Sequence, residues 1–301
     1  MTIVVTGGSG FIGSALTAAL LEKGHTVVVI DQRAPALTHQ NLYFIQCNLE
    51  ADLLPFNVLE RTDAIIHLAG KPIFEKWTEK VKQAIKQGRV EATRHIIQSL
   101  ERTTTRPSIF ISASAVGYYG EAGDTELDEK SPKGNTFLSD VVQVWEAEAA
   151  KAEQFGCRVV IVRTAPVIGT GGFLAPLVRL ARFWLVFKLG RRDFWQPWIH
   201  LEDIVRVYLF ALETSTLQGV VNAAAPTPVR HSELMKHFAK AVKRRLLGAL
   251  PLRLVKFLYG DFATEITTSQ KVYPRRLLDK GFTFEYTNVE GALRSITHEK
   301  K

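Results

Sequence analysis

A glycine-rich turn near the N-terminus constrains the fold of this chain more than any other segment. The apolar residues 3–5 lead into Gly7, Gly10 and Gly13, and residues 11–21 carry apolar side chains at helical spacing. This order predicts a buried strand, a tight turn and a helix. The first amides of that helix would bind a diphosphate, because they lie at the positive end of the helix dipole. The segment therefore predicts a dinucleotide-binding turn.

Each glycine of the turn has a distinct expected role. Gly7 would permit the tight turn, Gly10 would let the backbone approach a pyrophosphate, and Gly13 would let the helix pack close to the sheet. The chain contains 21 glycines, so this spacing is specific only because it lies between a strand and a helix. We expect the cofactor to contact Gly7, Gly10, Phe11, Ile12 and Gly13.

A second apolar run, residues 25–30, ends in Asp31, where an acidic residue meets the adenosine ribose in dinucleotide-binding folds. Its carboxylate would accept hydrogen bonds from both ribose hydroxyls and repel a 2′-phosphate. Arg33 acts in the opposite direction, since its guanidinium could hold that phosphate. The sequence therefore predicts NAD as the preferred cofactor, with NADP as the alternative. Asp31 could also be an ordinary turn or cap residue.

Apolar runs alternate with helical patterns along most of the chain. Such alternation predicts an α/β fold with a doubly wound, Rossmann-like parallel sheet, whose ligands bind at the carboxyl ends of the strands. A cofactor-binding domain is expected over residues 1–165, completed by residues 200–225. A smaller substrate lobe is expected from residues 166–199, mostly irregular, and 226–301. Further strands are predicted at residues 42–45, 64–68, 109–112, 159–162 and 220–223, and the main helices at residues 78–100, 137–155, 201–212 and 232–242.

Small or polar residues follow the ends of several predicted strands. Asn48 and Leu49 follow the third strand, where they could meet the adenine edge. Ala69 and Gly70 follow the fourth, where small residues would let the cofactor lie against the backbone. With Ser112 at the end of the fifth strand, these residues complete the expected cofactor site. Their alternative role is ordinary turn chemistry.

The chain carries a formal net charge of +8, which raises the question of an anionic partner. Its basic residues are spread along the sequence without a nucleic-acid-binding motif, so we expect an anionic small molecule and no nucleic acid. The histidines show no metal-binding spacing, and Cys47 and Cys157 form no CxxC motif. Neither a metal site nor a disulfide framework is therefore expected. The sequence leaves the oligomeric state open.

Two stretches, residues 173–189 and 246–259, mix apolar residues with cations and could touch a membrane surface. Core helices of the smaller lobe are the preferred interpretation of both. The first predicted strand occupies the extreme N-terminus, and no uncharged stretch is long enough to span a bilayer. We therefore expect a cytoplasmic protein.

Four segments resemble the extended short-chain dehydrogenase/reductases: TGGSGFIG at residues 6–13, HLAG at 67–70, SASAVGYYG at 112–120 and WIHLED at 198–203. More narrowly, the chain is similar to their atypical branch of nucleoside-diphosphate-sugar epimerases, also described as cell-division-inhibitor-like. Residues 250–282 resemble the small C-terminal domain of that branch. The resemblance implies hydride exchange with a nicotinamide cofactor. It also implies a serine and a tyrosine at the substrate oxygen, with a lysine four residues after the tyrosine.

The proton relay of that family is missing here. None of the seven tyrosines is followed by a lysine four residues later, and Leu138 and Val142 stand at the family's tyrosine and lysine positions. A phenol titrates near pH ~10 unaided, so it needs a neighbouring cation to act as a base at neutral pH. The remaining candidate catalytic residues are Ser114, Tyr118 and Tyr119.

Each candidate has an alternative role. Ser114 matches the family's substrate-positioning serine, or it is a turn hydroxyl bonded to the backbone. Tyr118 or Tyr119 could donate a proton, or could pack beneath the nicotinamide or between the lobes. The sequence favours an NAD(P)-dependent oxidoreductase or epimerase acting on an anionic small molecule such as a nucleotide sugar. The alternative is a catalytically silent cofactor-binding sensor or scaffold, for instance in cell or plastid division.

Other residues near the expected cleft have two interpretations. Four residues follow the turn after the fourth strand and could face the substrate, although a solvated helix face is the preferred interpretation for the lysines: Lys71, Lys76, Trp77 and Arg89. Arg163 ends the sixth strand near the nicotinamide side, or it is a buried, paired structural charge. Trp195, Trp198 and His200 resemble the family's substrate-side wall, but packing is the preferred interpretation.

Overall fold

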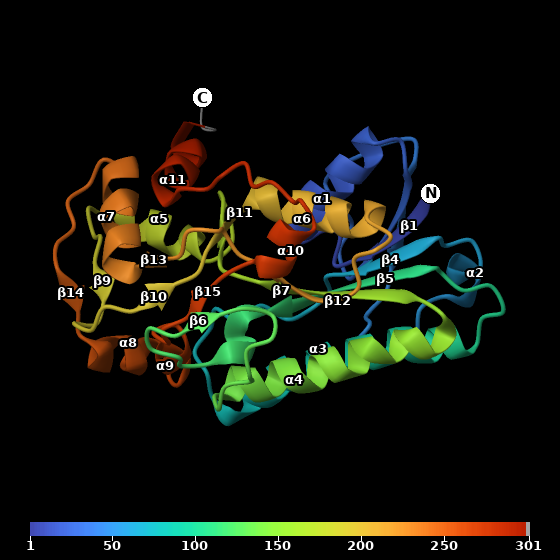
Figure 1. The fold of residues 1–301 in the computed structure, drawn as a ribbon, viewed down its shortest axis with the longest axis horizontal. Coiled ribbons are helices and arrows are strands. Elements are labelled where there is room, and N and C mark those ends of the chain that lie inside the picture. The colour runs from blue at the N-terminus through green and yellow to red at the C-terminus, as the bar shows by residue number, and fades with distance from the viewer. Residues whose placement is uncertain (299–301) are drawn as a thin grey trace.

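The computed structural model describes residues 1–298 and is built around one seven-stranded sheet (Figure 1). The strands are, in chain order, β1 (Thr2–Thr6), β2 (Thr26–Asp31), β3 (Leu42–Gln46), β4 (Ala64–His67), β5 (Ile109–Ala115), β7 (Arg158–Thr164) and β12 (Gly219–Ala223). They lie in the spatial order β12-β7-β5-β4-β1-β2-β3, and all neighbouring pairs are parallel. The strand order reverses between β1 and β4, which places a crevice at their carboxyl ends. The predicted doubly wound sheet is confirmed.

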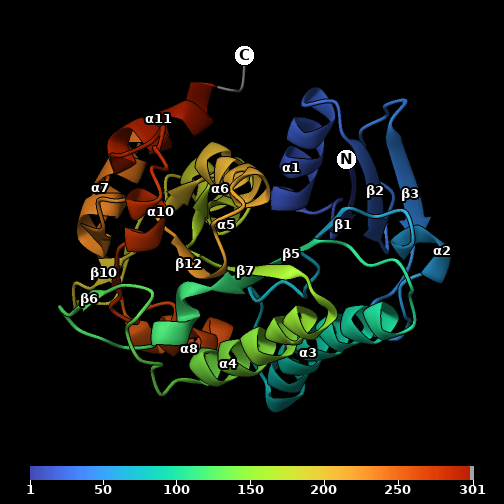
Figure 2. The same ribbon diagram turned by 45° about the vertical axis from the view of Figure 1, so that its right-hand side comes forward.

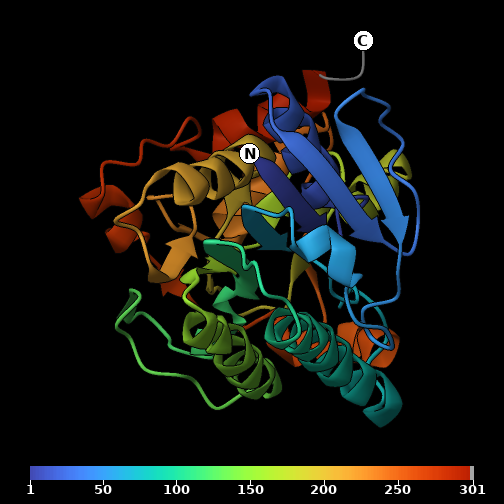
Figure 3. The ribbon, with the colours of Figure 1, turned by 90° about the vertical axis from the view of Figure 1, so that its right-hand side faces the viewer.

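Four long helices cover the two faces of the sheet (Figure 2): α1 (Phe11–Glu22), α3 (Glu79–Glu101), α4 (Phe137–Ala150) and α6 (Leu201–Glu213). α1 and α6 pack on one face, where Leu16 and Ile204 join Val5 in one apolar core. α3 and α4 lie side by side on the other face (Figure 3), where Ile96 joins Val4 in a second core. Val4 and Val5 enter different cores because neighbouring strand residues point to opposite faces.

α3 and α4 each begin at a threonine cap. Thr78 Oγ1 accepts a hydrogen bond from the amide of Val81 at 3.3 Å, and Thr136 Oγ1 accepts one from the amide of Ser139 at 3.3 Å. Each cap satisfies an amide that has no partner within its helix. Because both helices follow parallel strands, the capped ends lie at the carboxyl edge of the sheet, next to the crevice.

A third apolar core holds the smaller C-terminal region together. It is formed largely by α5 (Leu174–Arg182), α7 (His231–Ala241) and α11 (Val289–His298) around the fully buried Trp198. The sequence indicates a mostly irregular region over residues 166–199 but favours a core helix within residues 173–189, where α5 lies. Nine residues form a helix there because Leu174 and Ala181 are buried in this core, and such tertiary packing overrides a weak local pattern.

The remaining elements are short, and several join distant parts of the chain. Two-stranded ladders form between β6 and β15, β8 and β11, β9 and β14, and β10 and β13. No helix among residues 1–298 is long and apolar enough to cross a membrane. The remaining short elements of the chain are, in chain order, α2 (Phe56–Leu59), η1 (Val116–Tyr119), β6 (Glu126–Leu127), η2 (Lys151–Phe155), β8 (Val167–Ile168), β9 (Lys188–Leu189), β10 (Trp195–Gln196), β11 (Ile199–His200), β13 (Val229–Arg230), β14 (Ala249–Leu250), α8 (Leu252–Tyr259), α9 (Phe262–Glu265), β15 (Lys271–Val272) and α10 (Arg275–Asp279).

Candidate functional site

The glycine-rich turn between β1 and α1 leaves a row of backbone amides free. The amides of Phe11, Ile12 and Gly13 have no hydrogen-bond partner in the described part of the chain. The next amide, that of Ser14, donates to the carbonyl oxygen of Gly10 at 2.8 Å. The three free donors lie at the positive end of the α1 dipole. They can hold an anion such as a diphosphate.

Close backbone contacts explain two of the three glycines in the turn. Gly7 has a φ of +71°, and a Cβ there would lie 2.8 Å from the amide nitrogen of Ala69. A Cβ on Gly13 would lie 2.1 Å from the carbonyl oxygen of Gly7. A Cβ on Gly10 would meet only that same oxygen, at 3.2 Å. Gly7 and Gly13 therefore allow the turn to form, while Gly10 keeps the approach to the free amides open.

Two backbone amides hold Asp31 beside the turn, at the carboxyl end of β2. Its Oδ2 accepts a hydrogen bond from the amide of Ser9 at 3.1 Å, and its Oδ1 accepts one from the amide of Gln32 at 2.7 Å. Ser9 Oγ donates to the carbonyl oxygen of Arg33 at 2.6 Å, and Gln32 Nε2 donates to Asn48 Oδ1 at 2.9 Å. The structure thus brings Asp31, Arg33 and Asn48 together beside the turn. The adenosine end of a dinucleotide lies at this place in Rossmann folds.

The other predicted cofactor residues differ in their exposure. Gly70 is exposed at the end of β4, and Ala69 contacts the turn directly. Leu49 is buried, and Ser112 has no exposed surface and donates its hydroxyl proton to the carbonyl oxygen of Ala113 at 3.1 Å. The side chains of Leu49 and Ser112 therefore support the site from beneath and offer no surface to a ligand.

His67, at the end of β4, links the layers beneath the turn. Its Nδ1 lies 2.7 Å from Thr6 Oγ1, and its Nε2 lies 3.1 Å from Thr93 Oγ1. Thr93 donates its own proton to the carbonyl oxygen of Arg89, so it accepts from Nε2 while Thr6 donates to Nδ1. Burial lowers the pKa of His67 to about 3. The ring is therefore neutral and structural.

A buried ion pair joins β7 to α4 beside the end of β5. Nε and Nη2 of Arg163 donate to Oε1 and Oε2 of Glu146, each at 2.8 Å. Ser114 Oγ donates to Glu146 Oε1 at 2.6 Å. Nη1 of Arg163 donates to the Tyr119 hydroxyl at 3.1 Å, and that hydroxyl donates to Asn222 Oδ1 at 2.7 Å. One network therefore joins the predicted residues Ser114 and Tyr119 to Arg163.

Arg163 and Tyr119 keep their protons near neutral pH. Burial disfavours the charge on Arg163, but the hydrogen bonds and negative charge of Glu146 outweigh this and hold the pKa of Arg163 above its ordinary value. Burial raises the pKa of Tyr119 to about 12, although Arg163 acts in the opposite direction. Neither group exchanges a proton near neutral pH, so the network orients side chains and does not relay protons.

Tyr118 is the predicted catalytic residue whose hydroxyl stays free. Its ring centroid lies 3.3 Å from Cζ of Arg163, and it meets the ring of Tyr119 edge-on at 5.4 Å. The hydroxyl of this half-buried side chain makes no hydrogen bond within residues 1–298. Ser114 and Tyr119, in contrast, have both committed their protons to the buried network.

α4 presents apolar side chains at the positions of the missing relay. Val142 is buried, and Leu138 packs against the loop after β5, since a Cβ on Gly117 would lie 3.2 Å from Leu138 Cβ. Residues 1–298 also contain no group of three or more histidine, cysteine, aspartate or glutamate side chains that could hold a metal ion. The side chains of Leu138 and Val142 therefore offer no proton donor or acceptor at these two positions.

Arg89 brings a half-buried cation to the carboxyl edge of the sheet. A Cβ on Gly70 would lie 3.7 Å from Arg89 Cγ, and Arg89 Nη2 donates to the carbonyl oxygen of Lys71 at 2.9 Å. Its Cζ lies 5.4 Å from the ring centroid of Trp145. Burial lowers the pKa of Arg89 to about 10, so the group remains charged at neutral pH. Within the described chain no carboxylate lies within ion-pair distance of Arg89, although the negative charge of Glu50 is close enough to raise its pKa.

The aromatic residues before α6 are bonded to the protein itself. Trp198 is fully buried and donates from Nε1 to the carbonyl oxygen of Thr227 at 3.1 Å. His200 caps α6, where its Nδ1 accepts from the amide of Glu202 at 3.2 Å. Trp195 is half-buried on the separate ladder of β10 and β13. The packing interpretation is confirmed for Trp198 and His200.

Two comparisons with protein families fit this geometry. Residues 3–224, which include the free amides, Asp31 and the Arg163 network, match the NAD dependent epimerase/dehydratase family. The chain belongs to this family. Residues 250–296 match a domain of unknown function, DUF1731, so the C-terminal resemblance seen in the sequence is confirmed.

Curated relatives cover the whole chain. The Epimerase family protein YfhF of Bacillus subtilis is 32% identical over 302 residues, which span 100% of this chain and 99% of the relative. The chloroplastic SDR39U1 homolog of Arabidopsis thaliana is 33% identical, over 98% of this chain and 86% of the relative. The family resemblance inferred from the motifs is thus confirmed at full length.

Solved structures share the fold. The human epimerase family protein SDR39U1, crystallised with NADPH, has a TM-score of 0.86 and 29% identity, with 99% of both chains covered. A nucleoside-diphosphate sugar epimerase from Corynebacterium glutamicum has a TM-score of 0.79 and 28% identity over 99% of this chain and 58% of the other. The structure of a UDP-glucose 4-epimerase from Thermus thermophilus, 18% identical to this chain, contains NAD. The choice between NAD and NADP differs among the solved neighbours.

Sequence reasoning missed Glu146 and Asn222 as members of the site. Glu146 lies 32 residues from Ser114, and Asn222 lies 103 residues from Tyr119. Neither residue belongs to a local motif that would signal its role. The one available signal was Arg163, because a charge at the end of a buried strand requires a partner of opposite sign.

Proposed function

We propose that this protein binds a nicotinamide dinucleotide in its glycine-rich turn and oxidises and reduces an anionic small molecule, with nucleotide sugars as the preferred class. The observation that carries the proposal is the row of free amides at Phe11, Ile12 and Gly13 beside the anchored Asp31. With the diphosphate of the cofactor held by these amides, its nicotinamide ring would accept a hydride from the substrate and return it. Membership of an epimerase/dehydratase family supports this class of reaction.

Arg89 supports an anionic substrate. It brings a positive charge without an ion-pair partner among residues 1–298 to the loop that follows β4. Two backbone hydrogen bonds fix its guanidinium, so the cation is oriented before a ligand arrives. A phosphate or carboxylate next to Gly70 would neutralise this charge.

Tyr118 is the side chain that we assign to proton transfer at the substrate oxygen. Its hydroxyl is free, and the guanidinium of Arg163 against its ring fixes the orientation. Ser114 donates its proton to Glu146, so its oxygen can accept a hydrogen bond from a substrate hydroxyl. Tyr119 holds the loop in place through Asn222.

A catalytically silent sensor or scaffold is the second candidate function. The specific observation in its favour is that α4 offers Leu138 and Val142 at the positions of the missing relay. Arg163, Glu146 and Tyr119 are also committed to one another. In that case, cofactor binding would change the shape or stability of the protein without turnover.

We propose NAD as the preferred cofactor. Asp31 is held in place by two amides, and its carboxylate would repel a 2′-phosphate. Asp31→Ala is expected to weaken NADH binding and to reduce the discrimination against NADPH. Arg33→Ala should leave NADH binding unchanged. Titration calorimetry with both nucleotides measures the two effects, and unchanged affinities in Asp31→Ala would remove Asp31 from the site.

Turnover separates the two functions. The protein would be incubated with NADH or NAD and a panel of uridine, thymidine and guanosine diphosphate sugars. Nicotinamide absorbance would report oxidation or reduction, and proton NMR would report inversion at a sugar carbon. Tyr118→Phe is expected to reduce turnover about 100-fold while NADH affinity stays unchanged. Tyr119→Phe should lower the free energy of unfolding, because the network loses a buried hydroxyl.

Two outcomes would contradict the enzyme assignment. Tight NADH binding with no turnover on any sugar nucleotide would favour the sensor. Turnover that survives in Tyr118→Phe would move the proton transfer to another residue. We also propose that the protein works in the cytoplasm and that its primary partner is a small molecule and not a nucleic acid.

A further inference from the structure

Two segments of the smaller region carry cations and no carboxylates. Residues 169–192 and 234–260 contain no aspartate and no glutamate. The parallel pair β9 and β14 joins them, and the amide of Leu247 donates to the carbonyl oxygen of Val186 at 2.9 Å. They meet at the end of the molecule opposite α2 (Figure 1).

Large apolar side chains are exposed in the same segments. Phe183 and Phe257 are each 73% exposed, and Trp184 is 66% exposed. α8 buries Val255 and leaves four large apolar residues exposed, namely Leu252, Leu254, Phe257 and Leu258. The interpretation of residues 246–259 as a core helix is therefore wrong, because this helix lies on the surface.

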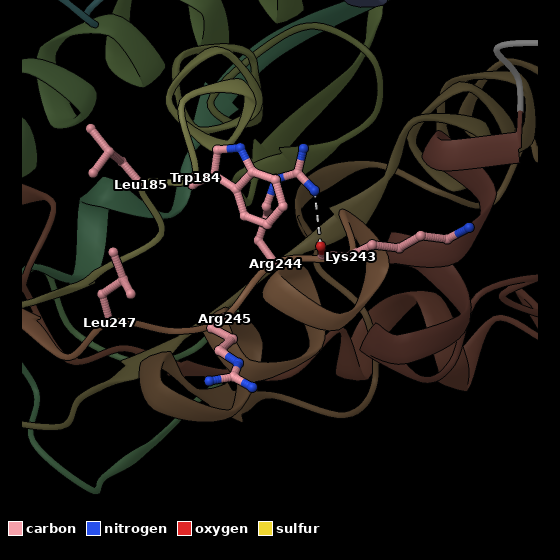
Figure 4. A pocket seen from close by; sticks show the side chains of 6 residues that line it. All are labelled: Trp184, Leu185, Lys243, Arg244, Arg245 and Leu247. Atoms are coloured by element: carbon pink, nitrogen blue, oxygen red, sulfur yellow. Dashed lines mark hydrogen bonds between the residues drawn. The ribbon is translucent and has the colours of Figure 1, made fainter.

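A hollow of about 470 Å³ lies between these segments (Figure 4) and is lined by Trp184, Leu185, Lys243, Arg244, Arg245 and Leu247. Arg244 Cζ lies 3.9 Å from the ring centroid of Trp184, and its Nε donates to the carbonyl oxygen of Ala181 at 3.0 Å. Lys243 and Arg245 extend away from the hollow and make no ion pair within residues 1–298. Apolar groups and unpaired cations therefore share one surface.

We infer that this basic apolar face, residues 182–185, 243–247 and 252–258, docks on a membrane surface rich in anionic phospholipid. Cations attract negatively charged headgroups, while exposed aromatic and leucine side chains enter the boundary between headgroups and acyl chains. Tryptophan prefers that boundary, because its ring is apolar and its N–H is polar. The inference concerns docking and is separate from the chemistry at the nicotinamide site.

Other occupants fit this face less well. A second copy of the chain would bring like charges together, since the face offers no carboxylate to pair with Arg245 or Arg253. Single-stranded nucleic acid could stack on Phe183, Trp184 and Phe257, but it would leave the exposed Leu252, Leu254 and Leu258 without a partner. An anionic lipid surface uses both the charge and the leucines.

Vesicle binding tests the inference. The full-length protein would be mixed with vesicles of phosphatidylcholine alone, or with about one part in four replaced by phosphatidylglycerol. Sedimentation is expected with the anionic vesicles only, and binding should weaken as salt is added. Tryptophan emission should shift to the blue on binding. Trp184→Phe should abolish that shift, because Trp77, Trp145 and Trp198 are buried and Trp195 is half-buried.

Single substitutions separate the contributions of apolar groups and charge. Phe257→Ser is expected to weaken vesicle binding about tenfold, and Arg245→Gln should weaken it and reduce its salt dependence. Tyr43→Ser is the matched control, because Tyr43 is 56% exposed but lies on β3, outside the face. All three substitutions affect exposed side chains, so NADH affinity and the unfolding midpoint should stay unchanged.

Three outcomes would overturn the inference. The first is absence of binding to anionic vesicles at low salt. The second is a dimer, seen by sedimentation equilibrium, that Phe257→Ser dissociates, since the face would then be a self-interface. The third is salt-sensitive binding to an oligonucleotide in place of vesicles.

Discussion

At the scale of single residues, the site contains a buried ion pair between Glu146 and Arg163 and lacks the tyrosine and lysine of the family's proton relay. Both side chains lose most of their hydration, so the pair persists only because every strong donor and acceptor is matched. Ser114 completes the set by donating to Glu146. The pair therefore links the loop after β5 to α4 and β7, and the Tyr118 hydroxyl stays without a hydrogen bond within residues 1–298.

Removal of one partner of this pair should be costly. Glu146→Gln leaves Arg163 charged and buried without a counterion, and we expect the free energy of unfolding to fall by about 3 kcal/mol. Urea unfolding followed by circular dichroism measures the change. Asp140→Asn is the control on the same helix. The side chain of Asp140 is 65% exposed in its ion pair with Lys133, so a loss below about 1 kcal/mol is expected there. Equal losses in both variants would contradict the structural role of the buried pair.

Two substitutions in the glycine-rich turn should affect folding and cofactor binding separately. A Cβ on Gly13 would collide with the carbonyl oxygen of Gly7 at 2.1 Å, so Gly13→Ala should lower the free energy of unfolding by about 1–3 kcal/mol. Gly10→Ala meets that oxygen at 3.2 Å and has an ordinary φ of −75°, so the fold should survive. Its methyl group would obstruct the approach to the amides and weaken NADH binding about tenfold. Calorimetry measures the affinity, and full affinity in Gly10→Ala would place the cofactor elsewhere.

At the scale of elements, the long periodic segments were predictable and the short ones were not. The apolar runs of β1, β2 and β4 and the pattern of α3 are set locally, by strands buried on both faces and a helix with one apolar face. β6 and β15 contain two residues each and exist because Lys271 and Val272 meet Glu126 and Leu127 from far along the chain. A local pattern cannot encode such a pair.

The cap of α3 allows a test of local encoding. Thr78→Ala removes the acceptor for the amide of Val81, and we expect the free energy of unfolding to fall by about 1 kcal/mol. Thr104→Ala is the matched control, because Thr104 is exposed in the turn after α3 and caps no helix. Chemical denaturation of both variants gives the comparison. If Thr78→Ala were as stable as the control, the cap would not contribute to stability.

At the scale of the whole molecule, charge and buried groups are distributed unevenly. The sequence shows a net charge of +8, yet it does not reveal that two acid-free segments meet on one surface. Their meeting depends on the pairing of β9 with β14, which joins residues about 60 positions apart.

Similarly, histidines spread along the chain become buried groups in separate layers. His67 lies beneath the turn, His200 caps α6, and His231 begins α7.

These buried histidines should make stability fall on mild acidification. Burial lowers the pKa of His67 to about 3 and the pKa values of His200 and His231 to about 4. The unfolded chain takes up protons on these groups below pH ~6.5, whereas the folded protein does not, so their contribution is complete above that pH and is lost as the pH falls. For His67 the loss at pH ~5 is about 2 kcal/mol. Urea unfolding between neutral pH and pH ~5 measures the slope. His67→Gln should flatten it relative to His39→Gln, whose side chain is exposed, and equal slopes would show that His67 is already charged in the folded state.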